Sequence, residues 1–593
     1  MKRIVVLGAG YAGVHAALTL HKKLKNDDIS ITLIDKNNYH TLLTELHEVA
    51  GNRVEEDSVK IALKDIFQYT KVMLVQDNIT NIDFEEKIVY SQNKQFKYDY
   101  LIIGCGSEPA YFGIEGMEES ALSLWSLEDA KIIHDHILDC FDSAAMETNK
   151  DIRRGYLTFV VGGGGFTGIE MVGELIQWVN ILCKEYNISR DEVRLIVVEA
   201  MDRILAVLHQ SLIDKAMKYL QRNGVEVLTN SPITKVTKDN LHLKSGDIIQ
   251  SKTVIWTGGV KVNDFVLHTD LQQAEKGRGR LEVNKFTQSN QYEHVFIVGD
   301  NSFFIQDDGK PLPLLVESAI QTGAAAAKNV VRHLKNQPLV ECKPKLHGTM
   351  VSVGRKYAVS DTMGYRTSGI MAMFIKHMVN IHYQFEVGGF EQIIRYLKHQ
   401  FIHKRKDDHF LKDHLTTISY TFFLFPMRVY LGYMWLIQGI KKYNSGWLSE
   451  TILYVERIGG LMPEPGSSAS PAADTAVEAV KQGMNLIGKY TPEWYAWIAE
   501  RIIVPNAMFF QTMIVLTEIG LGVAFLTGTF TFIAALISIV MNINFALSTG
   551  LYDYWYFVTS IACLAGAGRA FGVDHYLMPW LMRKWRYIVR NKT

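Results

Sequence analysis

Apolar residues occur in short runs over the first two thirds of the chain and in long runs over the last third. In the first part the short runs end on glycine or on an acid, as at residues 4–7, 29–34 and 193–198. Short runs of this kind, alternating with helical segments, are typical of the buried parallel strands of an α/β fold. The pattern therefore predicts α/β domains first and a strongly apolar region after them.

The stretch Val160–Glu174 (VVGGGGFTGIEMVGE) predicts a strand, a glycine turn and a helix. Its glycines Gly163, Gly165 and Gly168 have the G-x-G-x-x-G spacing, in which backbone amides at the start of the helix bind a pyrophosphate. A single motif of this kind also arises as a purely structural turn. The motif by itself therefore favours a dinucleotide site without establishing one.

A second glycine motif opens the chain, directly after the strand predicted at residues 4–7. Gly8, Gly10 and Gly13 have the same spacing, which explains the apolar start of the chain better than a signal peptide does. Two motifs in one chain predict two bound dinucleotides.

Each motif is followed by a strand that ends on an acid, Asp35 in the first case and Glu199 in the second. Asp35 comes about 20 residues after Gly13, which is the usual interval, whereas Glu199 comes later after its motif. A carboxylate at this point accepts hydrogen bonds from ribose hydroxyls and repels the 2′-phosphate of NADPH, so Glu199 favours NADH. Arg203 is close enough in sequence to weaken this preference.

Composition and charge exclude several classes of protein. The 62 basic and 62 acidic residues balance, so nothing indicates a nucleic-acid partner. The five cysteines include no C-x-x-C pair and no zinc-ligand spacing, which argues against a dithiol mechanism and against a metal site. The length of 593 residues predicts several domains.

Four features in order resemble the superfamily of flavoproteins that bind two dinucleotides. They are the leading glycine motif, the strand at Tyr100–Gly106 (YLIIGCG), the second glycine motif and the strand at Val295–Asp300 (VFIVGD). The resemblance implies two Rossmann-like domains, of which the first is discontinuous and holds FAD, with Asp300 near the ribityl and phosphate groups. The implied FAD residues are Gly8, Gly10, Gly13, Asp35, Ser107 and Asp300, and the implied NADH residues are Gly163, Gly165, Gly168 and Glu199.

Further motifs within about the first 400 residues are similar to those of type II NADH:quinone oxidoreductases. They are SEPAYFGIEG (107–116), FTGIEMVGEL (166–175), VIWTGGV (254–260) and GTMVSVGRKYAV (348–359). The resemblance implies a non-proton-pumping enzyme in which hydride passes from NADH to FAD and two electrons then pass to a membrane quinone. Adjoining nucleotide domains suit this transfer, since they bring nicotinamide and flavin together and the flavin supplies the chemistry.

Glu170 is the candidate catalytic residue. It lies four residues before Glu174 on the helix that follows the second motif, where the plainer interpretation is an acid stabilised by the helix dipole. The resemblance matches Glu170 with an acid near the nicotinamide and quinone pockets that is implicated in proton supply. A partly buried carboxyl with a raised pKa suits that role.

The helix expected to face the quinone departs from the A-Q-x-A-x-Q pattern of the family. Residues 316–321 are VESAIQ, so Gln321 is kept and Glu317 replaces the first glutamine. Glu317 either faces solvent or places an ionisable group beside the flavin or the quinone. Lys376, in an amphipathic stretch, either contacts the quinone or extends toward lipid headgroups, and the second interpretation is slightly favoured. Glu317, Gln321 and Lys376 are the candidate quinone-binding residues.

Two other functions are open on the sequence alone. A sulfide:quinone reductase shares the fold, but it needs redox cysteines on opposite sides of the flavin. Cys105 is instead predicted to be a small buried side chain. Outside enzymes, the alternative is a membrane receptor whose nucleotide sites sense redox state.

Four apolar runs predict an α-helical transmembrane domain with helices at residues 418–440, 508–527, 529–549 and 554–573, since about 20 helical residues cross a bilayer. Basic residues on both sides of this domain predict that the dehydrogenase domains and both termini are cytoplasmic, with an external loop at 441–506. We expect a multi-pass protein of the cytoplasmic membrane that contacts the lipid bilayer and the quinone pool. A homodimer is left open.

Charged residues within the apolar runs need partners, and Arg428 with Glu518 is the simplest pair. Residues 428–442 (RVYLGYMWLIQGIKK) and 568–574 (GRAFGVD) resemble the DoxX-like family of four-helix membrane proteins. The fusion resembles membrane-bound NADH dehydrogenases that feed a dedicated quinone pool, of the menaquinone or demethylmenaquinone class, in extracellular electron transfer of Gram-positive bacteria.

The predicted domains follow from these boundaries. They are an FAD-binding domain at 1–115 and 285–340, an NADH-binding domain at 116–284, a membrane-proximal segment at 341–402, a linker at 403–417, the transmembrane domain at 418–576 and a basic tail at 577–593.

Overall fold

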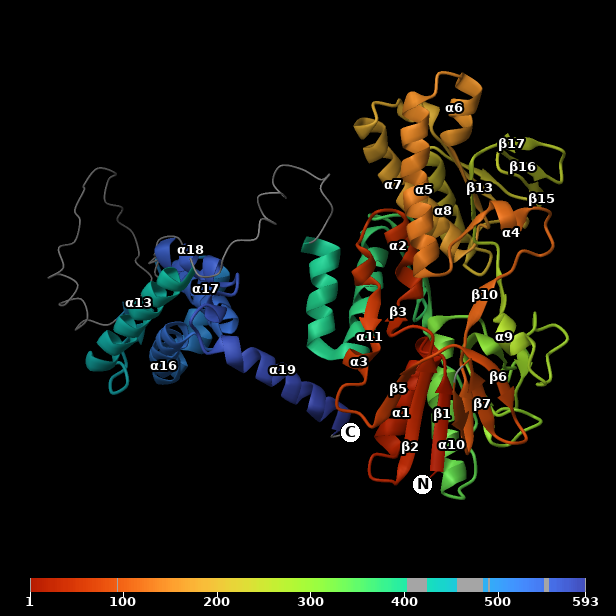
Figure 1. Cartoon of the computed structure of the whole chain (residues 1–593). Helices are drawn as coiled ribbons and strands as arrows, with labels where there is room; N and C mark the ends of the chain where they lie inside the picture. Colours follow the sequence, from red (N-terminus) through yellow and green to blue (C-terminus); the bar gives the residue numbers. More distant parts are fainter. Residues whose placement is uncertain are drawn as a thin grey trace. The chain divides into compact units, whose positions relative to one another are not determined.

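The computed structural model describes residues 2–92, 94–402, 424–455, 484–488, 491–548 and 554–591 (Figure 1). Two units are distinct: Met1–Thr416 with Arg586–Thr593, and Thr417–Trp585. The larger unit contains two parallel five-stranded sheets covered by helices, and the smaller unit is mainly helical. The predicted α/β fold is therefore confirmed. The predicted linker at 403–417 and the middle of the predicted external loop lie outside the described residues.

The first sheet combines two distant pieces of sequence. Its parallel strands are β1 (Lys2–Leu7), β2 (Ile29–Asp35), β5 (Val72–Gln76), β9 (Tyr100–Ile103) and β21 (Val295–Ile297), in the order β21-β9-β1-β2-β5. Helices α1 (Tyr11–Lys23) and α10 (Val316–Leu334) pack on this sheet and on each other (Figure 1). Strand β21, which follows the whole second sheet in the chain, pairs with β9 and so completes the first one.

The second sheet repeats the arrangement of the first. Its parallel strands are β11 (Leu122–Ser123), β12 (Thr158–Gly162), β13 (Arg194–Val198), β14 (Val225–Leu228) and β18 (Thr253–Trp256), in the order β11-β18-β12-β13-β14. The longer helices of this half are α5 (Leu127–Met146), α7 (Phe166–Glu185) and α8 (Gln210–Arg222). In both sheets the third strand leads into a glycine motif and its neighbour precedes the acid.

Short elements connect and flank the two sheets. The strands are β3 (Tyr39–Thr41), β4 (Lys60–Ala62), β6 (Ile79–Asp83), β7 (Ile88–Ser91), β8 (Gln95–Lys97), β10 (Ser107–Pro109), β15 (Ile233–Val236), β16 (Asn240–Leu243), β17 (Ile248–Gln250), β19 (Val260–Val262), β20 (Leu281–Glu282) and β22 (Ser302–Phe303). The helices are α3 (Leu63–Ile66), α4 (Met117–Ser120), α6 (Lys150–Tyr156) and α9 (Asp264–Leu267). Strands β6 to β8 and β15 to β17 form one three-stranded antiparallel sheet in each half.

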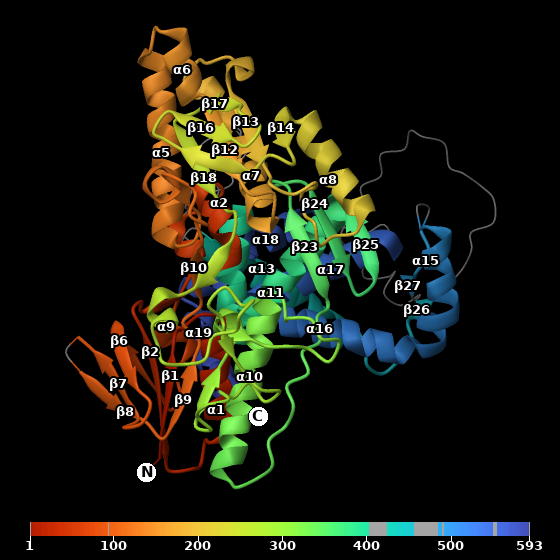
Figure 2. The same cartoon turned by 90° about the vertical axis from the view of Figure 1, so that its right-hand side faces the viewer.

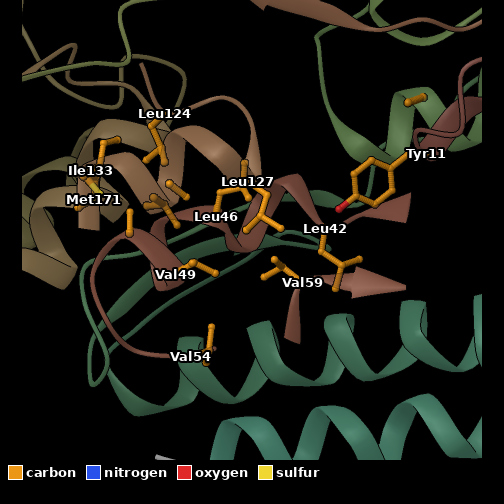
Figure 3. Packing of buried hydrophobic residues seen from close by; sticks show 14 of the residues in the cluster. Tyr11, Leu42, Leu46, Val49, Val54, Val59, Leu124, Leu127, Ile133 and Met171 are labelled. Atoms are coloured by element: carbon orange, nitrogen blue, oxygen red, sulfur yellow. The ribbon is translucent and has the colours of Figure 1, made fainter. Parts of the chain in front are cut away.

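A buried apolar cluster joins the two halves of the larger unit (Figure 3). Leu46 and Val49 of helix α2 (Leu46–Ala50) belong to the same cluster as Leu127 of α5 and Met171 of α7. A Cβ on Gly51 would lie 2.3 Å from the Cβ of Glu174, so glycine is needed where α2 ends against α7. The packing therefore holds α2, and the 3₁₀ turn η1 (Leu43–Glu45) before it, beside α7.

The last part of the larger unit is an antiparallel sheet followed by a long helix. Strands β23 (Gly348–Ser352), β24 (Ala358–Thr362) and β25 (Tyr365–Ser368) contact both α8 and α11 (Ile370–Leu397) (Figure 2). Helix α11 is interrupted at Gly389, which has φ 69° and ψ −159°. The second half of α11 returns toward the first, since the Tyr396 hydroxyl hydrogen-bonds Nδ1 of His377.

The smaller unit is built around four helices: α13 (Phe425–Asn444), α16 (Ala507–Thr527), α17 (Thr531–Ser548) and α18 (Tyr554–Cys563). Glycines allow α13 and α16 to pack closely, because a Cβ on Gly522 would lie 2.6 Å from the Cβ of Leu436. Other elements of the unit are α15 (Glu493–Ile498), β26 (Leu453–Tyr454) and β27 (Met484–Asn485). Helix α19 (Asp574–Asn591) follows at the end of the chain.

The predicted transmembrane helices are only partly matched. Among the described residues, two helical stretches are long and apolar enough to cross a bilayer, Glu493–Thr527 and Thr531–Ser548. The prediction of one helix over 554–573 is wrong, because α18 has 10 residues and ends at Cys563. The chain then turns, with φ 92° at Gly566, into the 3₁₀ turn η9 (Ala567–Arg569). Glycines in this stretch end the helix, which apolarity alone did not predict.

The predicted pair of Arg428 and Glu518 is also wrong. Arg428 is fully buried and donates to the carbonyl oxygens of Ala567, at 3.1 Å, and of Ala570 and Phe571. Glu518 instead forms an ion pair with Lys442. Helices α13 and α16 run antiparallel, so Lys442 lies level with Glu518, whereas Arg428 is about 20 Å away along α13 at about 1.5 Å per residue.

The carbonyl contacts of Arg428 give the first prediction. Arg428→Met keeps most of the side-chain volume but leaves buried carbonyl oxygens without a donor, at a cost of about 1–3 kcal/mol. We expect a lower melting temperature for the smaller unit, measured by tryptophan fluorescence of detergent-purified protein. Arg569→Met, at an exposed position in the same turn, is the control. Equal melting of both variants and the parent would contradict this role.

Candidate functional site

The two glycine motifs have the same geometry. Gly8 and Gly163, the first glycines, have φ of 92° and 113°, which other residues rarely adopt. At the third glycines, a Cβ would lie 1.8 Å from the carbonyl oxygen of Gly8 in the case of Gly13, and 1.9 Å from that of Gly163 in the case of Gly168. In both motifs the helix can therefore pack against the turn only with glycine at these positions.

The second glycines leave space for a ligand. Gly10 and Gly165 cap α1 and α7 without any side-chain hydrogen bond, and a Cβ at either position would have no protein atom within 4 Å. The first backbone amides of a helix have no partner within the helix and bind anions. The residues present thus fit a dinucleotide pyrophosphate in each half.

The two acids after the motifs also occupy matching places. Asp35 Oδ2 accepts from the amide of Ala9 at 2.6 Å, and Glu199 Oε2 accepts from the amide of Gly164 at 2.6 Å. The side chains therefore lie against the glycine turns, where a ribose binds in such folds. Burial raises the pKa of Asp35. Arg203 forms an ion pair with Asp202.

Two further predicted FAD residues are brought together from distant parts of the chain. Ser107, in β10, donates to Oδ2 of Asp300 at 2.6 Å. Asp300 lies in the 3₁₀ turn η4 (Gly299–Asn301) directly after β21, and burial raises its pKa. The turn also packs against the first motif, since a Cβ on Gly299 would lie 3.1 Å from the Cβ of Ala12. Ser107 and Asp300 therefore adjoin the first motif.

A cluster of buried and partly buried charges lies beside the start of α7, and we call it the ion cluster. Its acids are Glu45, Glu48, Glu170 and Glu174, and its cations are Arg53, Arg355 and Lys376. These residues come from η1 and α2 with the loop after them, from α7, from the loop after β23, and from α11. The cluster lies within the larger unit.

Glu48 and Glu174 carry the direct ion pairs of the cluster. Glu48 Oε1 is 2.8 Å from Lys376 Nζ and 3.2 Å from a guanidinium nitrogen of Arg53. Glu174 is 3.2 Å from Arg53 and 3.6 Å from Arg355. Although burial acts to raise the pKa of Glu48, Arg53 and Lys376 hold it well below its usual range. Glu48 is therefore an anion at any physiological pH.

Glu170 has a different environment. Its Oε1 accepts from the amide and the hydroxyl of Ser352, at 3.4 and 3.3 Å, and its Oε2 is 3.6 Å from Nδ1 of His47. Burial raises the pKa of Glu170 to about 7, against the opposing effect of Lys376. The Ser352 hydroxyl also accepts from Lys376 Nζ at 3.3 Å. Glu170 is thus a largely buried carboxyl, with 16% of its side chain exposed, that can hold or release a proton near neutral pH.

Lys376 does not extend toward lipid headgroups, as the favoured interpretation of the sequence had it. Its side chain is 7% exposed and its amine is bonded to Glu48. The sequence indicates that α11 is amphipathic, but this pattern does not show which lysine of the helix lies next to a buried carboxylate. Only the packing of α11 against α2 reveals that partner.

Glu317 and Gln321 lie outside the ion cluster. Glu317 forms an ion pair with His347 and accepts from its amide at 3.0 Å. One turn later, Gln321 hydrogen-bonds both the amide and the carbonyl of Lys345. Both side chains therefore fix the segment that leads into β23, and Glu317 is partly exposed to solvent in its ion pair with His347, outside the cluster.

Sequence reasoning missed Glu45, His47, Glu48 and Arg53. The signal was present, since the stretch LLTELHEVAGNR places two acids and two basic residues in an apolar context. Charged residues in such a segment are buried only with partners. Those partners are about 120 and 330 residues away in sequence, so no local pattern shows them.

The cysteines contain no redox pair. All five are free thiols, and burial raises the pKa of Cys105 to about 12, so its reactive thiolate is not formed near neutral pH.

Together, the paired glycine turns, their acids and the buried cluster define a flavoprotein class that binds two dinucleotides. Residues 2–323 match the family model "Pyridine nucleotide-disulphide oxidoreductase". Curated relatives from Staphylococcus saprophyticus and Staphylococcus aureus, both named type II NADH:quinone oxidoreductase, are 32% and 31% identical over 394 residues. These alignments cover 65% of this chain and 96% of each relative.

Solved structures support the same fold. NDH2 from Plasmodium falciparum in complex with NADH has a TM-score of 0.61 at 17% identity, covering 68% of this chain and 99% of that one. The sulfide:quinone oxidoreductase of Aquifex aeolicus has a TM-score of 0.54 at 18% identity, covering 67% and 95%. The chain belongs to the type II NADH:quinone oxidoreductases, within the pyridine nucleotide-disulphide oxidoreductase family.

The open space at the second glycines gives a paired prediction. Gly10→Ala should lower the content of bound FAD, and Gly165→Ala should weaken NADH binding by roughly tenfold, or about 1.4 kcal/mol. Each methyl group meets a ligand phosphate and no protein atom, so the protein without ligands should melt normally. Flavin absorbance and NADH titration measure the two effects, and each variant is the control for the other. Unchanged NADH affinity in Gly165→Ala would contradict the assignment.

Proposed function

We propose that this enzyme oxidises NADH at the second motif and reduces a membrane quinone through FAD held at the first motif, without pumping protons. The observation that carries the proposal is the repetition of one dinucleotide geometry in two halves of a single unit, next to a buried titratable cluster. The named relatives support both the donor and the acceptor.

FAD, when bound, supplies an acceptor for two electrons from NADH and a donor of two electrons to quinone. The chain itself binds and orients. Amides at the starts of α1 and α7 hold phosphates, and Asp35 and Glu199 take the ribose hydroxyls. The overall reaction, NADH + H⁺ + quinone → NAD⁺ + quinol, also consumes one proton from solution, and the chain must deliver that proton.

Glu170 supplies this proton in our proposal. It lies one turn into the helix whose first amides bind the NADH phosphates, and its carboxyl is protonated to a substantial extent at neutral pH. Ser352 and Lys376 connect it to the rest of the ion cluster. A general acid works best when its pKa is near the operating pH.

Quinone binding is assigned to the side of the cluster where Lys376 lies. Glu317 and Gln321 contribute to quinone binding indirectly, because they hold the segment Lys345–His347 in place. This segment leads into β23, the strand that carries Ser352. The replacement of a glutamine by Glu317 thus adds the ion pair with His347.

Removing the Glu170 carboxyl should separate the two half-reactions. In Glu170→Gln, reoxidation of the flavin by a soluble quinone should slow by about tenfold to a hundredfold, while its reduction by NADH changes little. In the parent, reoxidation should slow as the pH rises above 7, because the raised pKa means that the carboxyl loses its proton there. Stopped-flow absorbance under anaerobic conditions measures both steps.

Glu185→Gln, an exposed acid at the other end of α7, is the matched control. If Glu170→Gln slowed both half-reactions equally, the proton role would be lost.

The smaller unit inserts in the cytoplasmic membrane in our proposal, with the dehydrogenase and both termini on the cytoplasmic side. The two apolar helical stretches and the basic residues near both flanks support it. By resemblance to DoxX-like proteins and to their NADH dehydrogenase fusions, the quinone is of the menaquinone or demethylmenaquinone class and serves extracellular electron transfer.

This orientation predicts a labelling pattern. A cysteine introduced at Ser468, which lies outside the described residues, should react with an impermeant thiol reagent on intact cells. A cysteine at Ser245, exposed in the NADH-binding half, should react only after lysis. Labelling of Ser468→Cys only after lysis would reverse the proposed orientation.

A further inference from the structure

The ion cluster contains more acids than permanent cations. Its four carboxyls face three cations, Arg53, Arg355 and Lys376. His47 adds no charge, because burial and Lys376 hold its pKa well below the usual range. Since an unbalanced buried charge is costly, the cluster is most stable when one of the four carboxyls carries a proton.

The geometry shows where that proton is held. Glu48 and Glu174 are each paired with two cations, and Glu48 is firmly ionised. Glu170 and Glu45 have no ion pair with Arg or Lys within the described residues. Burial raises the pKa of Glu174 as well, but its two cations favour the ionised form, so we assign the extra proton to Glu170 and Glu45.

Glu45 is built to stay neutral. It is 4% exposed, its Oε1 accepts from a neutral donor, Asn380 Nδ2, at 2.7 Å, and its carboxyl also hydrogen-bonds the Glu48 side chain. Its Oε2 is buried and accepts from no donor in the part of the chain that the structure describes, so only a proton on the carboxyl itself can satisfy it. Burial, with Glu48 three residues away, raises the pKa of Glu45 to about 8. At pH 7 the carboxyl is mostly protonated.

We propose that Glu45 is the proton store of the enzyme, refilling Glu170 after Glu170 has given its proton to the reduced quinone. The proposal rests on the proposed function and adds a residue and a route to it. Per turnover, one proton leaves the Glu45 carboxyl, one arrives at Glu170, and one enters Glu45 from solution. No other group changes its state, so the sequence accounts for the single proton that NADH:quinone oxidoreduction consumes.

Close contacts connect most of the route from Glu45 to Glu170. Glu45 and Glu48 are three residues apart in consecutive helical turns and therefore on one face. Glu48 bonds Lys376 at 2.8 Å, Lys376 bonds the Ser352 hydroxyl at 3.3 Å, and that hydroxyl bonds Glu170 at 3.3 Å. Each group along the chain accepts one proton and passes on another.

The route to solvent runs through the second half of α11. Asn380 donates to Glu45 and, at 3.2 Å, to the Tyr396 hydroxyl, so it holds the phenol beside the acid. The hydroxyl is 2.7 Å from Nδ1 of His377, a partly exposed residue. Burial lowers the pKa of His377 to about 4, so the ring is a neutral hydrogen-bonding group near pH 7. The return of α11 at Gly389 is what brings Tyr396 to this place.

The charged and titratable groups that face Glu45 come from every element around it. They are Glu48 of α2, Arg53 of the loop after α2, Lys376 and Tyr396 of α11, and Tyr11 of α1. Burial raises the pKa of both tyrosines well above the usual range, so they stay neutral, and Arg53 and Lys376 stay charged. Glu45 therefore titrates near neutral pH among groups that keep their charge, and Glu170, at the far side of Lys376, titrates in the same range.

The test is a pH comparison of Glu45→Gln with the parent and with Glu55→Gln, an exposed acid ten residues later in the chain. Flavin reoxidation by a soluble menaquinone analogue is followed by stopped flow at pH 6 and pH 8. At pH 6 Glu170 is itself protonated, so Glu45→Gln should be within about twofold of the parent. At pH 8 Glu170 has largely lost its proton while Glu45, whose pKa is higher, keeps more of its own, so Glu45→Gln should be slower by severalfold, on the order of fivefold.

If the role of Glu45 were merely structural, Glu45→Gln would slow flavin reoxidation equally at pH 6 and at pH 8. That result would overturn the proposal, and so would a reoxidation rate at pH 8 equal to that of the parent. Tyr396→Phe removes only the hydroxyl and provides a second test if Glu45→Gln fails to fold. It should slow steady-state turnover while leaving the first turnover unchanged, and unchanged steady-state turnover would likewise count against the route. If NADH does not reduce the flavin of the parent, the proposed function itself fails. This outcome can be told apart from the results that would contradict only the role of Glu45.

Discussion

Neutralisation of buried carboxylates is the constraint on which the larger unit depends. Glu48 and Glu174 are fully buried, and a buried carboxylate without a cation costs several kcal/mol. The cations that meet this requirement are Arg53, next to α2, Arg355, after β23, and Lys376, on α11. Three segments that are far apart in sequence must therefore converge on α7, and the same convergence encloses Glu170.

Helix α7 connects cofactor binding with this charged interior. Its first amides adjoin the glycine turn of the second motif, Glu170 follows within about one turn, and Glu174 one turn later. Because a helix is stiff over such a distance, the glycine turn and Glu170 are held in a constant relation. Because Gly51 and Gly173 have no side chains, the backbone of α2 and that of the loop after β23 can both pack closely against the same face of α7.

The smaller unit handles its charges in a different way. Arg428 is satisfied by backbone carbonyls where the chain turns after α18, and Asp574 accepts from the amides of Phe530 and Thr531 at the start of α17. Both charges thus satisfy backbone groups that helix ends leave without partners. Glu518 and Lys442 form an ion pair between α16 and α13, and Lys442 also lies over the ring of Trp447.

The amino-acid sequence by itself determined whatever depends on local spacing. Gly8, Gly10 and Gly13, and their counterparts at 163, 165 and 168, could be assigned because a turn that accepts a pyrophosphate needs glycine at fixed intervals. Asp35 and Glu199 were predicted because each comes at the end of an apolar strand, and Asp300 was predicted from the family resemblance. The α/β fold class followed from the same runs of residues.

Only the tertiary structure decided the partners of buried charges. Lys376 and Glu48 are 328 residues apart, and Glu45 and Asn380 are 335 apart, so neither pair leaves a trace in local periodicity. Arg428 and Glu518 were paired wrongly because the register between antiparallel helices is set by glycine contacts such as Gly522 with Leu436. Spacing along a chain is a local property, whereas neutralising a buried charge requires a partner from wherever the fold brings one.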